Sequence, residues 1–260
     1  MSFEYLIISV SEERKTIMIK QIHDLKLKAP FSFLPNPATI STISDYIKDS
    51  PYLTHGYQIR SICCGLSHYR AIEYACKSLS SEYVVILEDD VAIHKTQFEN
   101  GINEIISKWD TFVAPKKIAS IGWIPCRNYS AYLTATAPNS LICIPGSKLL
   151  IDRYVPGLQA YIIKRIDFIS CLHDLIHPTH ETFKKHIIEK AHPAIDYKDV
   201  IMPVDMILNR LYGAVVMFPL LAIEQETPSI IDNADSHKDL YWKPFFKNYE
   251  AVRDDYYKPS

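Results

Sequence analysis

The stretch EYVVILEDDV, residues 82–91, decides the fold that we predict for this chain. Its five apolar or aromatic residues, 83–87, follow one another without alternation and end at three consecutive acids, Glu88, Asp89 and Asp90. A short continuous apolar run is typical of a strand that is buried on both faces inside a mostly parallel sheet. In open α/β sheets, ligands bind beyond the carboxyl ends of the strands, which is where these acids stand.

The three acids allow two interpretations. Like charges this close together cost free energy unless a cation or hydrogen-bond donors neutralise them. Carboxylate oxygens suit Mg²⁺ or Mn²⁺, which usually also hold substrate phosphates. Alternatively, the acids only end the strand and cap the next helix. The stretch alone leaves both interpretations open.

Composition excludes some functional classes. The chain has 260 residues, of which 48% are hydrophobic and 22% charged, an ordinary globular composition. A formal net charge of −2 gives no electrostatic field for nucleic acid or anionic membranes, so we expect no nucleic-acid partner. With only 7 glycines, the chain has no Gly-rich phosphate loop.

The cysteines and the hydropathy pattern indicate a cellular location. The six cysteines show no C-x-x-C spacing, so we interpret them as reduced thiols in a reducing compartment. The first residues show no signal peptide, and no apolar run approaches the roughly 18 residues of a membrane span. We therefore expect a cytoplasmic protein without a transmembrane segment.

The N-terminal third reads as strand, turn and helix. Residues 3–9 predict a strand, Ser11 a helix N-cap, and 16–27 a helix, so residues 9–14 could touch a nucleotide or form an ordinary surface turn. Residues 30–51, with four prolines, predict an irregular connection or lid.

A second helix is predicted over residues 65–79. Its first turn would contain Ser67, His68 and Arg70, near the end of the helix dipole that attracts phosphate. A hydrogen-bonded core histidine is the simpler interpretation of His68.

The remaining elements follow the same alternation. We predict helices over 96–108, 166–176 and 204–212, strands over 118–121, 141–144, 157–163 and 214–218, and a C-terminal tail from residue 235 that packs against the domain. Asp205, in the first turn of the 204–212 helix, has an ordinary role as an acid that stabilises the helix dipole.

Several of these segments together resemble one family. The segments CGLSHYRA (64–71), ILEDDV (86–91), QAYII (159–163) and PVD (203–205) look, in this order, like the core of glycosyltransferase family 25. That family includes lipooligosaccharide and collagen galactosyltransferases. The resemblance implies an α/β, glycosyltransferase A-like fold, with a mixed, mostly parallel sheet flanked by helices. It implies one domain over 1–260, with a donor half over about 1–125, an acceptor and catalytic half over about 126–232, and a packed tail over 233–260.

The resemblance also implies the chemistry. It suggests a metal-dependent, inverting transfer of a hexose, with galactose favoured, from a UDP-sugar to a hydroxyl of a glycan, lipooligosaccharide or glycoprotein acceptor. Mn²⁺ or Mg²⁺ would be the cofactor, with Asp90 as its ligand and His237 as a further one, and Asp205 would be the general base. The remaining expected site residues are Ser9, Arg14, His68, Arg70, Glu88 and Asp89 at the donor, and Gln159, Tyr161 and Gln225 along the donor or acceptor pocket.

Two other functions share part of this pattern. A sugar nucleotidyltransferase also has acids at a strand end, but it would normally carry a Gly-rich basic loop after the first strand, and residues 10–15 contain no glycine. A degenerate relative would bind a sugar nucleotide or glycan without turnover. The retained acids, His68 and Asp205 argue against that alternative.

Overall fold

The structure of the chain is a computed structural model. It describes residues 2–42, 56–114, 117–122, 140–144, 157–170, 172, 208, 214–218, 220–225 and 252–258. Two expected site residues, Asp205 and His237, lie outside the described residues, as does most of the predicted helix over 204–212.

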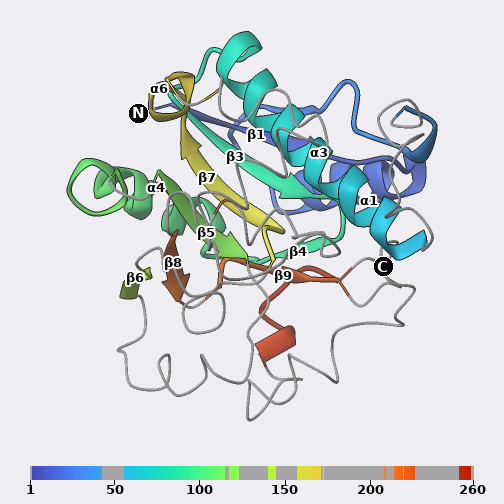
Figure 1. The fold of residues 1–260 in the computed structure, drawn as a ribbon. Coiled ribbons are helices and arrows are strands. Elements are labelled where there is room, and N and C mark those ends of the chain that lie inside the picture. The colour runs from blue at the N-terminus through green and yellow to red at the C-terminus, as the bar shows by residue number, and fades with distance from the viewer. Residues whose placement is uncertain are drawn as a thin grey trace.

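A seven-stranded mixed sheet organises the described residues, in the order β2-β1-β3-β7-β5-β8-β6 (Figure 1). Its strands are β1 (Phe3–Ile8), β2 (Phe31–Phe33), β3 (Tyr83–Glu88), β5 (Ile118–Gly122), β6 (Ser140–Ile144), β7 (Ala160–Lys164) and β8 (Ala214–Phe218). Strands β2, β1 and β3 are parallel, β7 runs antiparallel between β3 and β5, β8 is parallel to β5, and β6 is antiparallel to β8. Most of these strands therefore run in one direction, which confirms the predicted α/β class with a mixed, mostly parallel sheet.

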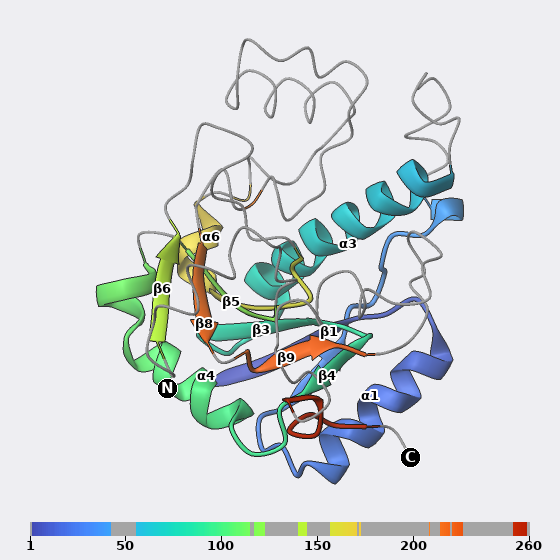
Figure 2. The ribbon, with the colours of Figure 1, turned by 90° about the horizontal axis from the view of Figure 1, so that it is seen from below.

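Strand β3 is buried on both faces, as its unbroken apolar run predicts. Tyr83, Val85 and Leu87 face one core and Val84 and Ile86 the other, and all five side chains are almost fully buried. The helices α1 (Glu12–Asp24) and α4 (Phe98–Ser107) and the π-helical turn η1 (Trp109–Val113) pack on the first face. The long helix α3 (Gly56–Ser78) and the short α6 (Arg165–Ile169) pack on the second (Figure 2). Because both faces are covered, the stretch shows no alternation.

A small second sheet follows the acids directly. Strand β4 (Val91–Ile93) pairs antiparallel with β9 (Ala222–Glu224). The C-terminal residues 252–258 lie against this sheet, because the Tyr256 hydroxyl donates a hydrogen bond to the carbonyl of Leu220 and the backbone N–H of Tyr257 to that of Ile93. The prediction of a packed tail over 233–260 falls mostly outside the described residues.

Two local predictions are wrong. Strand β2 lies inside the segment predicted to be irregular, because hydrogen bonds at Pro30 and Leu34 add it to the edge of β1. Helix α3 begins at Gly56 rather than at residue 65, since the buried Gly65 is accommodated inside the helix. Ser67, His68 and Arg70 therefore lie well inside α3, and the argument from a helix N-terminus does not apply to them. In contrast, Ser11 is the N-cap of α1, as predicted, and accepts a hydrogen bond from the N–H of Arg14.

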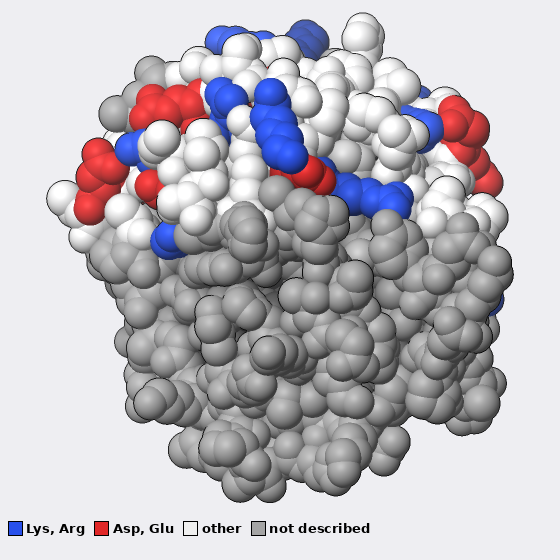
Figure 3. Space-filling model, turned by 45° about the horizontal axis from the view of Figure 1, so that its top comes forward, with Lys and Arg blue, Asp and Glu red and all other residues white. Residues whose placement is uncertain are grey.

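Charges of both signs share the described surface. On the face shown in Figure 3, lysine and arginine side chains are interspersed with acidic ones. Among the described residues, several oppositely charged side chains form pairs one helical turn apart, such as Lys20 with Asp24 and Lys77 with Glu73. Among the described helices, none is long and apolar enough to cross a membrane.

Candidate active site

The carboxyl ends of β1 and β3 meet at one edge of the sheet, where Ile8 pairs with Glu88. A cavity of about 1010 Å³ opens there. Its lining comes from these two strand ends, from the start of α1, from residues 38–41 and from α3. It includes Ser9, Arg14, Cys64, His68, Glu88, Asp89 and Asp90. The parallel pairing of β1 with β3 thus brings residues from three distant segments to one place.

Arg14 is the cation that the structure places on the acidic strand end. Its Nη1 lies 3.1 Å from Oδ1 of Asp89 and 3.4 Å from Oδ2 of Asp90. The side chains of Arg14, Asp89 and Asp90 are 14%, 9% and 18% exposed, so water screens these charges only partly. Arg14 lies on α1, which follows β1 directly. The packing of β1 and α1 therefore positions the guanidinium beside the two aspartates.

The positive charge of Arg14 does not offset the effects of burial and of the neighbouring carboxylates on Asp89 and Asp90. Burial, followed by the nearby carboxylates of Glu88 and Glu224, raises the pKa of Asp90 well above the usual value for aspartate. Burial also raises the pKa of Asp89, against the opposing effects of Ser9 and Arg14. A further positive group at this position would stabilise the charged forms of both carboxyls.

The donor set fits a hard divalent cation. Oδ2 of Asp89 and Oδ1 of Asp90 are buried and have no hydrogen-bond partner. Such unpartnered carboxylate oxygens beside a cavity are the ligands that Mg²⁺ and Mn²⁺ prefer. Asp89 and Asp90 would hold the cation, and the cavity has room for the phosphates and water that complete its coordination shell.

His68 connects Glu88 to the core of the protein. Its Nε2 lies 2.8 Å from Oε1 of Glu88, and its Nδ1 lies 3.1 Å from the Tyr161 hydroxyl. His68 and Tyr161 are 1% and 0% exposed. Both ring nitrogens are thus occupied, so the imidazole orients Glu88 at the cavity wall and does not rotate freely as a surface histidine would.

Of the two other residues expected at the donor, Ser9 lines the cavity and Arg70 does not. Ser9 is buried in the cavity wall, where its hydroxyl donates to the carbonyl of Ser11 and so shapes the turn into α1. Arg70 donates a hydrogen bond to the carbonyl of Asn36 and is not among the residues that line the described cavity.

The expected pocket residues lie behind the acids. The carbonyl of Gln159 accepts a hydrogen bond from the backbone N–H of Glu88. The backbone N–H of Gln225 donates to the carbonyl of Asp90, and its side-chain amide to that of Val91. In the described residues these glutamines therefore hold the backbone on both sides of the acidic turn, while Tyr161 reaches His68.

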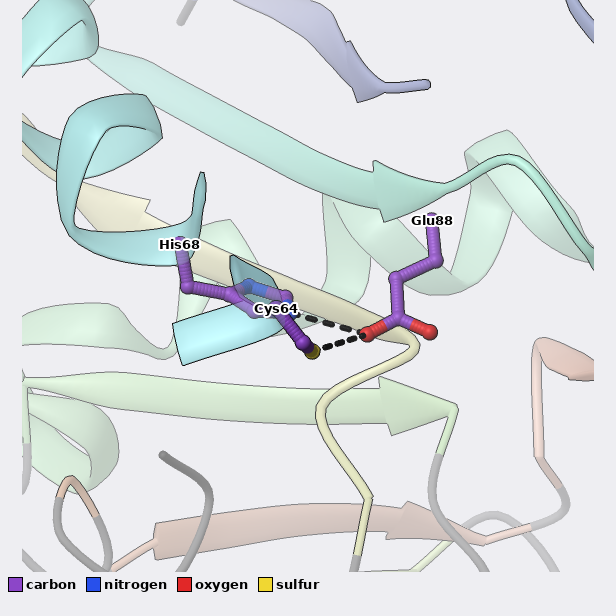
Figure 4. Close-up of side chains that lie close together, drawn as sticks. All are labelled: Cys64, His68 and Glu88. Atoms are coloured by element: carbon purple, nitrogen blue, oxygen red, sulfur yellow. Dashed lines mark hydrogen bonds and ion pairs between the residues drawn. The ribbon is translucent and has the colours of Figure 1, made fainter. Parts of the chain in front are cut away.

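Cys64 is a site residue that the sequence pattern does not single out. Its Sγ lies 3.9 Å from Oε1 of Glu88, and Sγ, the His68 nitrogen and the Glu88 oxygen all lie within 4.8 Å of one another (Figure 4). The spacing of Cys64 and His68, four residues apart, is the signal that would reveal the pair on a helix. A helix predicted to begin at residue 65 leaves Cys64 outside it, and so hides this spacing.

Comparison with models of known protein families agrees with the resemblance seen in the sequence. The family model described as "Glycosyltransferase family 25 (LPS biosynthesis protein)" matches residues 2–180. No curated protein matches the chain.

Solved structures with similar chains include two of the galactosyltransferase LgtC. One, in complex with donor and acceptor sugar analogues, is 10% identical with a TM-score of 0.44, and the match covers 100% of this chain and 98% of that chain. The other, an active-site mutant, is 10% identical with a TM-score of 0.45 and the same coverage.

Proposed function

This chain belongs to glycosyltransferase family 25, and we propose that it is a metal-dependent, inverting hexosyltransferase. The donor is a UDP-sugar, with UDP-galactose favoured, and the acceptor is a hydroxyl of a glycan of the lipooligosaccharide or glycoprotein kind. The observation that carries the proposal is the pair of unpartnered carboxylate oxygens on Asp89 and Asp90 at the wall of a large cavity.

The described residues suit the donor. A sugar nucleotide carries a diphosphate, and its leaving group gains negative charge as the glycosidic bond breaks. A divalent cation on Asp89 and Asp90 would supply Lewis-acid stabilisation of that charge. Arg14, bound to both aspartates, keeps their side chains in place before the cation binds. Among the described residues, those that line the cavity lie between Ile8 and Asp90.

Glu88 acts on the sugar or ribose hydroxyls in this proposal. Its Oε1 accepts a hydrogen bond from His68, whose other nitrogen is held by Tyr161. A carboxylate with a fixed orientation can select hydroxyls at one position, because it loses little side-chain freedom when the donor binds. His68 and Tyr161 are positioning residues in this arrangement.

Inversion needs a base for the acceptor hydroxyl. Asp205, in the P-x-D segment of the family resemblance, is the proposed base; it would take the hydroxyl proton as the oxygen attacks the anomeric carbon from the face opposite UDP. His237 remains the proposed additional metal ligand from the C-terminal region.

A donor screen tests the proposal. UDP- and GDP-sugars are incubated with the full chain, with and without Mn²⁺, and release of the nucleoside diphosphate is measured. We expect Mn²⁺-dependent hydrolysis of one UDP-hexose, lost in Asp90→Ala. Asp205→Asn should still bind the donor, measured as a thermal shift, but should not transfer the sugar. If no sugar nucleotide gives either turnover or a thermal shift with Mn²⁺, the proposal is wrong.

A further inference from the structure

We propose that Cys64, His68 and Glu88 form a second cation site, suited to Zn²⁺, in the wall of the same cavity. It differs from the Asp89 and Asp90 site in chemistry, because it offers a thiol, an imidazole and a carboxylate in place of hard oxygens alone. Sulfur and nitrogen ligands select Zn²⁺ and similar ions, whereas oxygen ligands suit Mn²⁺ and Mg²⁺.

The three ligand atoms converge from two rigid elements. Cys64 and His68 stand one turn apart on α3, and Glu88 ends β3 (Figure 4). Their atoms lie within 4.8 Å of one another, with 2.8 Å from His68 to Glu88 and 3.9 Å from Cys64 to Glu88. Ligands around a tetrahedral Zn²⁺ are about 3.3–3.5 Å apart, given bonds of about 2.0 Å to nitrogen or oxygen and 2.3 Å to sulfur. Small side-chain movements therefore complete the site.

The histidine also has the support that metal-binding histidines need. A ligating imidazole usually donates its second ring N–H to a fixed acceptor, which sets its tautomer and orientation. Here Nδ1 of His68 lies 3.1 Å from the buried hydroxyl of Tyr161, which leaves Nε2 facing Glu88. When the ion binds, the Cys64 thiol loses its proton to solvent. The imidazole proton of His68 moves from Nε2 to Nδ1, which then donates to the Tyr161 hydroxyl, and the His68–Glu88 hydrogen bond is replaced by two bonds to the metal.

The site would remain open toward the cavity. Cys64, His68 and Glu88 all line it, and three protein ligands leave a fourth position for water or a bound molecule. Because Glu88 would be a ligand of Zn²⁺, it would no longer be available to the sugar donor. Zn²⁺ should therefore inhibit transfer in competition with the donor. This inhibition, unlike the binding itself, rests on the proposed function.

Cobalt spectroscopy tests the binding. Co²⁺ is titrated into the metal-free full chain, and the near-ultraviolet absorption of a cobalt–thiolate bond is recorded before and after addition of Zn²⁺. We expect one equivalent of Co²⁺ to produce the band and Zn²⁺ to remove it. Cys64→Ser should lose the band and bind Zn²⁺ at least about tenfold more weakly in competition with a chromophoric chelator.

Cys63→Ser is the matched control. Cys63 is the adjacent thiol and also lines the cavity, but it is not part of the cluster, so this variant should keep the band. Glu88→Gln should keep the band with weaker affinity, and circular dichroism verifies that each variant folds. A wild-type protein without the band, or a band that persists in Cys64→Ser, overturns the proposal.

The outcome is independent of the glycosyltransferase assay. Asp90→Ala should lose Mn²⁺-dependent turnover but keep the cobalt–thiolate band. If the donor screen fails while the band follows Cys64, only the proposed function is wrong; if turnover is normal while the band is absent, only the Zn²⁺ site is wrong.

Discussion

Nη1 of Arg14 lies 3.1 Å from Oδ1 of Asp89, and this ion pair joins the first turns of α1 to the acidic end of β3. The two residues are 75 positions apart in the sequence. The acids stand at the end of β3. The parallel neighbouring strand β1 leads into helix α1, and α1 carries the arginine whose positive charge offsets theirs.

We expect Arg14→Gln to destabilise the metal-free protein. Loss of the guanidinium leaves Asp89 and Asp90 without their shared cation, and breaking a partly buried pair should lower the free energy of unfolding by about 2 kcal/mol or more. Because Mn²⁺ would replace the missing charge, it should stabilise the variant more than the wild type. Urea unfolding with and without Mn²⁺ measures both effects.

The control for that experiment is Lys15→Gln. Lys15 is the next residue, and it pairs with the 87% exposed side chain of Glu12. Its loss should change the free energy of unfolding by less than about 1 kcal/mol. Equal stability of the Arg14 and Lys15 variants would show that the ion pair with Asp89 does not hold the site.

Asp90→Asn should remove the response to Mn²⁺. At a free concentration of about 100 times Kd, a cation that binds only the folded state stabilises it by about 2.7 kcal/mol. We expect a stabilisation of this order in the wild type and none in Asp90→Asn, measured by thermal unfolding. Asp110→Asn, which changes an 80% exposed carboxylate on η1, should respond as the wild type does. A persistent Mn²⁺ effect in Asp90→Asn would place the cation elsewhere.

Tyr161→Phe should remove the hydrogen bond that holds the imidazole of His68 in place. The change keeps the buried ring but removes the hydroxyl at 3.1 Å from Nδ1, so a buried imidazole nitrogen loses its partner. A loss of about 1–2 kcal/mol in the free energy of unfolding is expected. Since Glu88 would be held less firmly, KM for the donor should rise more than kcat falls. An unchanged KM would argue that Glu88 is oriented without this chain of hydrogen bonds.

His94 should make the stability of the protein depend on pH. Its Nδ1 accepts hydrogen bonds from the N–H groups of Thr96 and Gln97, and burial lowers its pKa from the ordinary 6.5, against the opposing effect of Asp255. Below pH 6.5 the His94 side chain is therefore protonated in the unfolded chain but still neutral in the folded protein. The free energy of unfolding should fall as the pH drops from about 6.5 toward the lowered pKa.

Unfolding by urea between pH 5 and pH 8, compared with His94→Asn, measures this contribution. Asparagine keeps an acceptor for the two N–H groups but cannot be protonated, so the variant should lose part of the acid sensitivity. Wild type and variant with the same pH dependence would show that other groups cause it.

The sequence predicts most of the described strands because their runs of apolar residues reflect burial in the sheet. Strand β3 is the best example, since an unbroken apolar run that ends at Glu88 matches a short strand covered on both faces. Strand β2 escapes prediction because Phe31–Phe33 has no pattern of its own; hydrogen bonds to the edge of β1 create it. The start of α3 escapes it because glycine has a low helix propensity and suggests a helix boundary, whereas Gly65 is buried inside the helix.

The candidate site is predictable where function constrains residue type. The acids and Arg14 follow from their positions after strands and from the family resemblance, and His68 follows from the resemblance alone. The pairing of His68 with Tyr161, and of Cys64 with Glu88, depends on how α3 crosses the sheet, which no local pattern encodes.

The antiparallel β7 between β3 and β5 has a consequence for synthesis on the ribosome. Residues 3–8 and 83–88 can pair early, but the other edge of β3 receives its partner only when Ala160–Lys164 has emerged. Until then an apolar strand is an open edge, and such edges recruit strands from other chains. Chaperone binding between these two events should therefore increase the yield of monomeric protein.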